Sequence, residues 1–525
     1  MARFPRPMRP GVKRWIVLTH TYLGVAFALL FVMWFASGIV LAYSPFPSLS
    51  AEDRLRFAPA LDCASCRVSE AEAKALLGIQ TARVGDASAL GMLGTRPVWR
   101  IVDDRLRWHA VFADIASVVP MVDSTTGSAI ALGFARSRRP DLPATVRASY
   151  VSRLTEPDQW TLEQPMPSQL PMLRYDLNDD DGTRVYISQA GAEVVTLSVR
   201  HERALAYFGA IPHWIYPTLL RRHVRAWSGF VILLSALGTL MSIAGLTIGI
   251  WQWRWRARAR RTSEGRPRPR SPYREFVMRW HHLLGLVFGL CVCSWVFSGL
   301  MSMNPGEWSP GSTPDTALRE RWSGDGGALA TAHVTAIDAW RVMIGAGDVP
   351  HTMQLDRIGG HAFWVGQSAG SRGVLIDADA PGAGVTDLTE SALIANAVRC
   401  LDGAQLIDVA LLKDGDDYFR QTPEHHLDAP VLRLRFADTP STWLYVDPAI
   451  GALKATYASR SRLERWLYSG LHDFDFRWLL SHRPLWDVVV VGLSIGGLLG
   501  SLSGAVLAIR WLRDFRRLAP RYRRR

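Results

Sequence analysis

Four long stretches without a charged residue decide what this chain can fold into. They cover residues 15–43, 226–253, 280–304 and 488–509. A helix that crosses a membrane needs about 20 consecutive apolar residues, a length that a helix in a soluble core rarely sustains. We therefore predict a membrane α-helical fold with four transmembrane helices.

Basic residues orient these helices, because they gather before the first span, after the second and after the fourth. Short segments rich in Lys and Arg stay in the cytoplasm. We expect a multi-pass protein of a bacterial inner membrane with both termini cytoplasmic. The net charge of +13 then reflects topology, and nucleic-acid binding is not expected. The first apolar run exceeds the apolar core of a signal peptide, about 7–15 residues, and indicates a signal anchor.

The expected organisation follows from these spans. In chain order it comprises a basic tail (1–14), span 1 (15–43), an outer domain (44–222), span 2 (223–253), a basic loop (254–275), span 3 (276–303), a second outer domain (304–481), span 4 (482–510) and a basic tail (511–525).

The two long segments between the spans are expected to face outward, because the basic segments stay in the cytoplasm, and to form soluble α+β domains. Residues 69–77 favour a short helix. Turn-forming residues interrupt apolar stretches at 122–127 and 445–451, which predicts β-hairpins there. Cys63 and Cys66 form a C-x-x-C pattern, for which a local disulfide is expected outside the cytoplasm, with a redox-active dithiol as the alternative. His425 and His426 are expected in a solvated loop.

The chain repeats itself, and this is its most informative feature. With one constant offset, the first span aligns with the third; with a second offset, the segments around the second and fourth spans align. Polar and aromatic residues match as well as apolar ones. The aligned pairs include His20 with His281, Gly24 with Gly285, Trp34 with Trp295, Ser37 with Ser298, His213 with His472, His223 with His482 and Trp227 with Trp486. We infer two tandem parallel repeats, which place equivalent residues at equal depth around an axis along the membrane normal.

Paired histidines are the candidate cofactor ligands. His20 and His281 lie inside the first and third spans, and the glycine one turn further along each helix leaves room for a planar macrocycle. Haem iron takes axial imidazoles, and helix bundles hold such groups between facing helices. A solvated interfacial histidine and a glycine in helix packing are the simpler alternatives.

Further histidines stand at the other membrane face. His223 and His482 begin the second and fourth spans, and His213 and His472 precede them in expected pre-membrane helices. Which of these pairs holds a cofactor, and whether pairing occurs across the axis or within one half, remains open at this point. His282 has no counterpart in the first half. It is a candidate ligand in place of His281, or a residue that donates a hydrogen bond to a ligand.

Two segments resemble the PepSY-associated transmembrane family. They are residues 18–24 and 280–285, each with a histidine followed shortly by Leu-Gly, and Ser37-Gly38 and Ser298-Gly299 follow one helix later. The outer hairpins and the 69–77 helix are similar to PepSY modules. The arginine common after the family's histidine is absent, since Thr21 and His282 stand there. Some members are inner-membrane ferric-siderophore reductases with b-type haem, so the resemblance implies a haem protein that moves electrons outward.

The hypothesis is a transmembrane electron conduit with two b-type haems. His20 and His281 hold the inner haem, and His223 and His482 hold the outer one, flanked by His213 and His472. An unknown donor supplies electrons, and a ferric siderophore or other iron chelate is reduced in the periplasm. The rival hypothesis is a haem-free membrane anchor whose PepSY-like domains bind or inhibit periplasmic partners. In either hypothesis, membrane lipid surrounds the spans. A metal or siderophore transporter ranks last, because the spans carry few ionisable groups.

Overall fold

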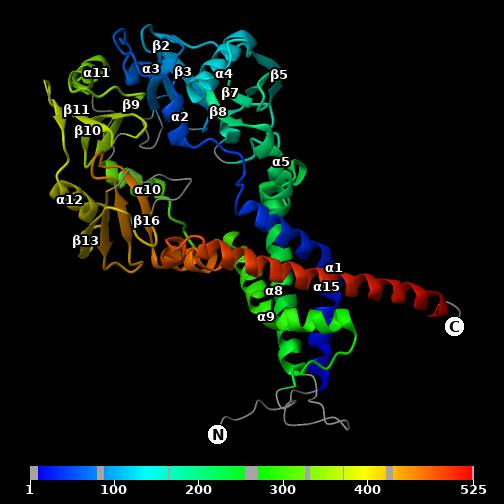
Figure 1. Ribbon diagram of the computed structural model, residues 1–525. Helices are drawn as coiled ribbons and strands as arrows, with labels where there is room; N and C mark the ends of the chain where they lie inside the picture. The colour runs from blue at the N-terminus through cyan, green and yellow to red at the C-terminus, as the bar shows by residue number, and fades with distance from the viewer. Residues whose placement is uncertain are drawn as a thin grey trace. The chain divides into compact units, whose positions relative to one another are not determined.

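The chain forms two compact units, each built from several segments (Figure 1). The computed structural model describes residues 10–79, 88–103, 105–163, 166–254, 270–324, 332–370, 372–382, 384–420 and 430–522. A helical membrane unit comprises residues 1–46, 204–309 and 463–525, and an outer unit comprises residues 47–203 and 310–462. His425 and His426 lie outside the described residues.

Four long helices form the membrane unit, as the sequence predicts. They are α1 (Pro10–Leu41), α8 (Val224–Gln252), α9 (Phe276–Ser302) and α15 (Leu485–Tyr522). Each is long and apolar enough to cross a membrane. Helix α1 packs against α8 and α15, and α9 also packs against α8 and α15, so α1 and α9 lie diagonally opposite in the bundle.

Short helices lead into α8 and α15, and the membrane unit includes them from residue 204 and from residue 463 onward. Before α8 come α5 (Arg200–Phe208), α6 (Ala210–His213) and α7 (Thr218–Arg221). Before α15 come α13 (Ser459–Arg465), the π-helical turn η3 (Trp466–Gly470) and α14 (Arg477–Leu480). Helix α6 packs on α1, and η3 packs on α9. The domain boundaries expected at 222 and 481 therefore differ from the structure, where residues 204–222 and 463–481 fold back onto the bundle.

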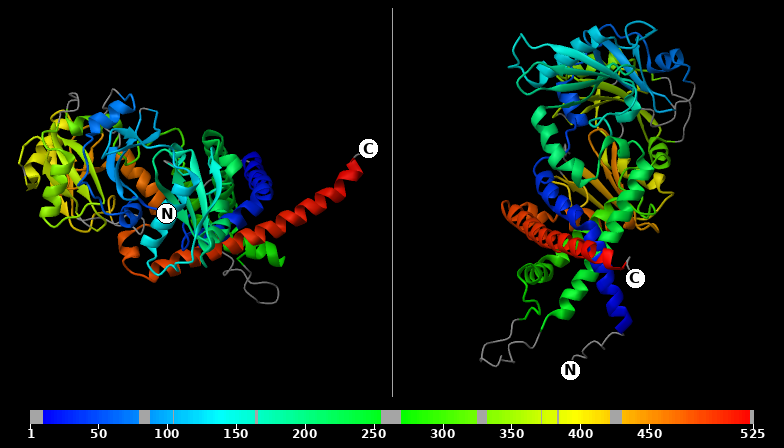
Figure 2. Two further views of the ribbon diagram at one scale, coloured as in Figure 1. Left: turned by 90° about the horizontal axis from the view of Figure 1, so that it is seen from above. Right: turned by 90° about the vertical axis from the view of Figure 1, so that its right-hand side faces the viewer.

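The outer unit is built around one eight-stranded antiparallel sheet, to which both outer segments contribute (Figure 2). Its strand order is β12-β11-β10-β9-β1-β2-β3-β4. The strands are β1 (Ser88–Leu93), β2 (Arg96–Val102), β3 (Trp108–Phe112), β4 (Ser117–Val118), β9 (Thr352–Ile358), β10 (His361–Gln367), β11 (Val374–Asp377) and β12 (Val385–Thr386).

Two four-stranded antiparallel sheets complete the outer unit. The first lobe contains β5 (Ala148–Leu154), β6 (Met172–Leu177), β7 (Arg184–Ser188), β8 (Glu193–Ser198) and the 3-10 helix η1 (Met166–Gln169). The second lobe contains β13 (Leu406–Leu412), β14 (Val431–Phe436), β15 (Trp443–Val446) and β16 (Leu453–Tyr457). The helices of the outer unit are α2 (Ala51–Phe57), α3 (Glu70–Leu76), α4 (Ser124–Arg138), α10 (Thr316–Ser323), α11 (Ala336–Gly345) and α12 (Glu390–Cys400).

A shared core joins the two outer segments. One hydrophobic cluster contains Trp99 and Leu90 from the first segment and Trp364 and Met353 from the second. The rings of Trp99 and Trp364 lie 6.2 Å apart between centroids. Strand β1 pairs directly with β9. The expectation of two separate outer domains is therefore replaced by one compact unit, because each segment completes the sheet and core of the other.

The structure confirms three of the local predictions made for the outer segments and contradicts one. A capping box formed by Ser69 and Glu72 starts α3, as the helical prediction over 69–77 requires. The turn at 445–451 joins the paired strands β15 and β16. Cys63 and Cys66 form the expected disulfide. The hairpin predicted at 122–127 is wrong, because the Asp123 side chain accepts a hydrogen bond from the Thr126 amide and caps α4.

Candidate functional site

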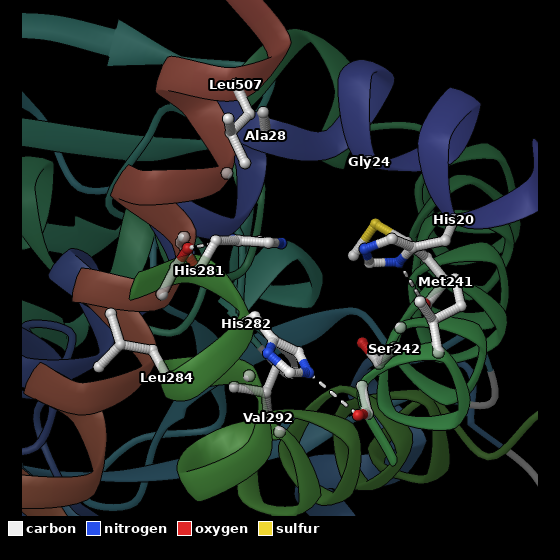
Figure 3. Close-up of a pocket in the computed structure, with 18 of the residues that line it drawn as sticks. His20, Gly24, Ala28, Met241, Ser242, His281, His282, Leu284, Val292 and Leu507 are labelled. Carbon is white, nitrogen blue, oxygen red and sulfur yellow. Dashed lines mark hydrogen bonds between the residues drawn. The ribbon is translucent and has the colours of Figure 1, made fainter. Parts of the chain in front are cut away.

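Two imidazole rings face each other across the bundle between the diagonal helices α1 and α9. The ring centroids of His20 and His281 are 6.2 Å apart, and both side chains extend into the same open space (Figure 3). Nδ1 of His20 donates to the Met241 carbonyl of α8, at 3.1 Å. Nδ1 of His281 lies 3.3 Å from the Gly500 carbonyl and 3.0 Å from Ser503 Oγ, both on α15. Each ring is thus held by the helix beside its own.

A cavity of about 560 Å³ surrounds this inner pair, within the range of about 300–1,000 Å³ common for cofactor sites. Its walls are mainly apolar and come from all four long helices. Gly24 and Gly285 line it, and a Cβ atom at either position would meet nothing within 4 Å. The sequence predicted this space, since each glycine follows its histidine by one helical turn.

Other glycines let the inner histidine rings approach a neighbouring backbone. A Cβ atom at Gly245 would lie 2.5 Å from Cε1 of His20, and one at Gly504 would lie 3.2 Å from Cε1 of His281. Gly245 and Gly504 occupy aligned positions of the two halves. The rings are therefore packed edge-on against α8 and α15, which fixes their orientation toward the cavity.

A second imidazole pair lies near the other end of α1 and α9. The ring centroids of His213 and His472 are 6.0 Å apart. Nδ1 of His213 donates to the Trp34 carbonyl at 3.1 Å, and Nδ1 of His472 donates to the Trp295 carbonyl at 3.2 Å. Both donors come from the segments that fold back before α8 and α15, and both acceptors lie on the long helices.

Serine and glycine complete the seat of each outer histidine. Ser37 Oγ lies 3.3 Å from Nδ1 of His213, and Ser298 Oγ lies 3.0 Å from Nδ1 of His472. A Cβ atom at Gly38 would be 3.1 Å from Cε1 of His213; the matching distance from Gly299 to His472 is 3.6 Å. The Ser-Gly pairs that the sequence singled out are therefore the surfaces on which the outer histidines rest.

Burial keeps the outer pair neutral. Desolvation lowers the pKa of His213 to about 4, with a smaller contribution from repulsion by His472, and the hydrogen bond to Trp34 opposes the shift. Desolvation also lowers the pKa of His472 to about 4. Both imidazoles are therefore uncharged at neutral pH, the form in which imidazole ligates a metal.

The hydrogen bonds fix the tautomer of all four paired histidines. A backbone carbonyl can only accept, so Nδ1 carries the proton and Nε2 keeps its lone pair. Within the described part of the chain, no hydrogen-bond partner approaches Nε2 of His20, His281, His213 or His472. An Nδ1–H bond to a carbonyl with a free Nε2 is the usual arrangement around a ligating histidine.

The remaining predicted histidines are placed differently. His282 is buried and uses both nitrogens: Nε2 donates to the Gly249 carbonyl and Nδ1 pairs with Ser271 Oγ, each at 3.0 Å. It ties the start of α9 to the end of α8 and has no free lone pair for a metal. His223 and His482 are exposed, and among the described ring contacts neither lies against another histidine. The structure brings together His213 and His472 instead, because their segments fold back onto the bundle.

Aromatic side chains occupy the region between the two histidine pairs. Phe27, Phe31 and Phe35 of α1 form a buried cluster with Met241 and Val296. The Phe31 ring lies 5.7 Å from that of Trp34, and the Phe35 ring lies 5.9 Å from that of Trp295. The interior of the bundle between the pairs is therefore lined by apolar and aromatic side chains.

Comparison with known families identifies the chain. The family model for the PepSY-associated TM region matches residues 17–381. The chain belongs to this family. The match extends from the first span through the third and into the second outer segment, so the protein is a membrane protein of the PepSY-associated TM family. No curated protein sequence matches it.

Sequence reasoning missed the residues that hold the histidines. The backbone carbonyls of Trp34, Trp295 and Met241 could not be predicted as acceptors from residue type, because every residue has a carbonyl. The glycines at 245 and 504 carried a signal, since they match across the two halves. Their contact with the histidines could be found only once the packing of α1 on α8 and of α9 on α15 was known.

Proposed function

We propose that this protein is a haem-containing transmembrane electron-transfer protein of a bacterial inner membrane, with both termini cytoplasmic, which reduces a ferric chelate such as a ferric siderophore in the periplasm. One observation carries the proposal: two pairs of imidazoles, each ring with a hydrogen-bonded Nδ1 and a free Nε2, stand near opposite ends of the same two helices. The matched positions of the pairs support an origin by tandem duplication.

The two imidazoles of each pair would hold one haem iron between them. A metal–imidazole bond is about 2 Å, so the two rings of such a pair must lie within a few ångströms of the same metal. The observed centroid separations are 6.2 Å and 6.0 Å. The open space beside Gly24 and Gly285 supports a planar macrocycle at the inner pair. The proposal therefore assigns one haem b to His20 and His281, and a second to His213 and His472.

The outer assignment replaces the pair expected from sequence. His223 and His482 are exposed, and an exposed imidazole at the head of a helix is poorly fixed for axial ligation. His213 and His472 are seated by a carbonyl, a serine and a glycine each. Their placement supports the alternative that sequence analysis left open.

The residues of this chain hold, orient and shield the redox groups. When bound, haem supplies a reversible one-electron carrier at each level. Helix rise of about 1.5 Å per residue puts His20 and Ser37 about 26 Å apart along α1, so the two sites lie near opposite membrane faces. A buried apolar and aromatic cluster lies between them. A donor on the inner side would give one electron for each Fe(III) that becomes Fe(II) in the chelate, and hard oxygen ligands hold Fe(II) less firmly.

The deciding experiment is the dithionite-reduced minus oxidised visible spectrum of the purified protein, with a pyridine haemochrome assay. We expect a low-spin b-type α-band and two haems per chain. The paired variants H213A and H472A should each remove one haem, whereas H223A and H482A, matched controls from the same two segments, should retain both. A featureless spectrum from protein produced with ample haem would contradict the electron-transfer proposal and favour the hypothesis of a haem-free membrane anchor.

Activity completes the test. Reduced protein mixed with a ferric chelate should reoxidise, and ferrozine should trap the Fe(II) that forms. Protein with a full haem complement that is not reoxidised by any ferric chelate would contradict the reductase part of the proposal while leaving the haem sites standing.

A further inference from the structure

The two lobes of the outer unit differ at one place where their strands otherwise correspond. In the first lobe, Asp176 of β6 lies opposite Arg184 of β7. In the second lobe, Arg435 of β14 lies opposite Trp443 of β15. The neighbouring pair keeps its character, Arg174 with Tyr186 in the first lobe and Arg433 with Tyr445 in the second. The second lobe therefore has Arg435 where the first lobe has Asp176, and Trp443 where the first lobe has Arg184.

In the first lobe a carboxylate satisfies the arginines. Asp176 accepts from Nε and Nη2 of Arg174 at 3.3 and 3.2 Å. It also accepts from Nε and Nη2 of Arg184 at 3.0 and 3.4 Å. Two guanidinium groups thus share one acceptor group within the protein, and each Nε donor has a partner.

In the second lobe that acceptor is missing. Among the described residues, three buried donor atoms have no hydrogen-bond partner there: Nε of Arg433, Nε of Arg435 and Nε1 of Trp443. A buried donor without a partner is costly, and native proteins keep few of them. Three such donors on one sheet face point to an acceptor that the chain does not itself supply.

The three donors belong to one cluster around the Trp443 ring. The guanidinium carbons of Arg435 and Arg462 both lie 4.5 Å from the ring centroid, and that of Arg433 lies 5.3 Å away. Asp408 ion-pairs with both Arg433 and Arg435, and Asp416 ion-pairs with Arg433, yet neither carboxylate reaches the Nε donors of the two arginines. The Arg435 side chain is 36 % exposed, so the cluster reaches solvent at this residue, although the three donor atoms themselves are buried.

We propose that the second lobe binds an oxyanion at the cluster of Arg433, Arg435, Arg462 and Trp443. The bound oxygens take the role of the Asp176 carboxylate, because Arg433 and Trp443 stand where the first lobe has Arg174 and Arg184, the two residues that donate to Asp176. Guanidinium groups are well suited to carboxylate and related oxygens. The occupant is an iron chelate with carboxylate or catecholate oxygens, and this identification rests on the proposed ferric-chelate reductase function. Free phosphate shares the same chemistry and is separated from it by experiment.

The test is calorimetric titration of the full-length protein in detergent with Ga(III)–citrate, which is redox-inert, and separately with inorganic phosphate. The variant R435D returns to the second lobe the carboxylate that the first lobe has, so the cluster satisfies itself. R174Q changes the first-lobe arginine that corresponds to Arg433 and is the matched control. We expect Ga(III)–citrate to bind the wild type and R174Q alike, and R435D to bind it at least about tenfold more weakly.

The outcomes separate the site from the function. Equal binding by R435D and wild type, or no binding of either anion by the wild type, would overturn the site. Phosphate binding as tight as that of Ga(III)–citrate would overturn the chelate as its occupant. Loss of binding in a variant with an unchanged melting temperature and elution volume supports the site. Because the titration requires no electron transfer, it can succeed in a protein whose haem spectrum is featureless, and that result would refute the proposed function alone.

Discussion

The inner and outer histidine pairs have nearly equal distances between ring centroids, 6.2 and 6.0 Å, but different parts of the chain position them. The inner histidines, His20 and His281, stand on two membrane-spanning helices, and their rings are hydrogen-bonded to the other two. The outer histidines, His213 and His472, come from short fold-back segments and are hydrogen-bonded to the spanning helices. The inner pair thus depends on how four long helices pack, whereas the outer pair also depends on how the short fold-back segments pack on α1 and α9. The two sites should therefore differ in their tolerance of substitution.

The largest effect is expected from removal of an inner ligand. H281A leaves His20 without its partner across the cavity, so the inner haem should be lost or become high-spin, and the stoichiometry should fall from two haems toward one. Chelate reduction driven from the inner side should fall by at least about a hundredfold. Haem assay, resonance Raman spectroscopy and stopped-flow reduction would measure this.

The control for H281A is H482A, a change of the same kind at an exposed histidine. A reduction rate in H281A equal to that of H482A would show that electrons do not need the inner pair. Comparison with H213A then sharpens the contrast, because loss of the outer pair should leave the inner α-band unchanged.

A smaller, graded effect is expected at the glycines beneath the rings. G245A would bring a Cβ atom to 2.5 Å from His20, whereas G299A would bring one only to 3.6 Å from His472. The first contact forces the ring or α8 to move, and the second is ordinary van der Waals contact. We expect G245A to displace the inner α-band or reduce haem occupancy severalfold, and G299A to behave like the wild type.

Redox titration of G245A and G299A would show which of the two glycine–histidine contacts has the larger effect on the midpoint potential. The same midpoint potentials and occupancy in G245A and wild type would mean that His20 is not seated as described. Since the inner seat is built from packed spanning helices, it should be less able to relax than the outer one.

The sequence predicted the spans and their order from the length of the apolar runs, and it predicted the inner pair from the match between the two halves of the chain. His20, Gly24, His281 and Gly285 lie on helix faces that can be read from their spacing. The outer pair could not be chosen from four candidates, because fold-back of residues 204–222 and 463–481 is a tertiary event with no periodic signal. The joint eight-stranded sheet was missed for the same reason: pairing of β1 with β9 links residues far apart in the chain.

His282 marks the point where the two halves of the membrane unit differ, since Thr21 stands at the aligned position. The described hydrogen bonds make His282 a tether rather than a ligand, so H282Q should leave two haems and an unchanged spectrum. Loss of one or both buried hydrogen bonds should lower stability by about 1–3 kcal/mol. T21A, the matched change in the other half, removes only an exposed hydroxyl bonded within its own helix and should shift the melting temperature little. Thermal unfolding followed by fluorescence would compare the two variants, and a lost or altered inner α-band in H282Q would return this residue to the list of ligands.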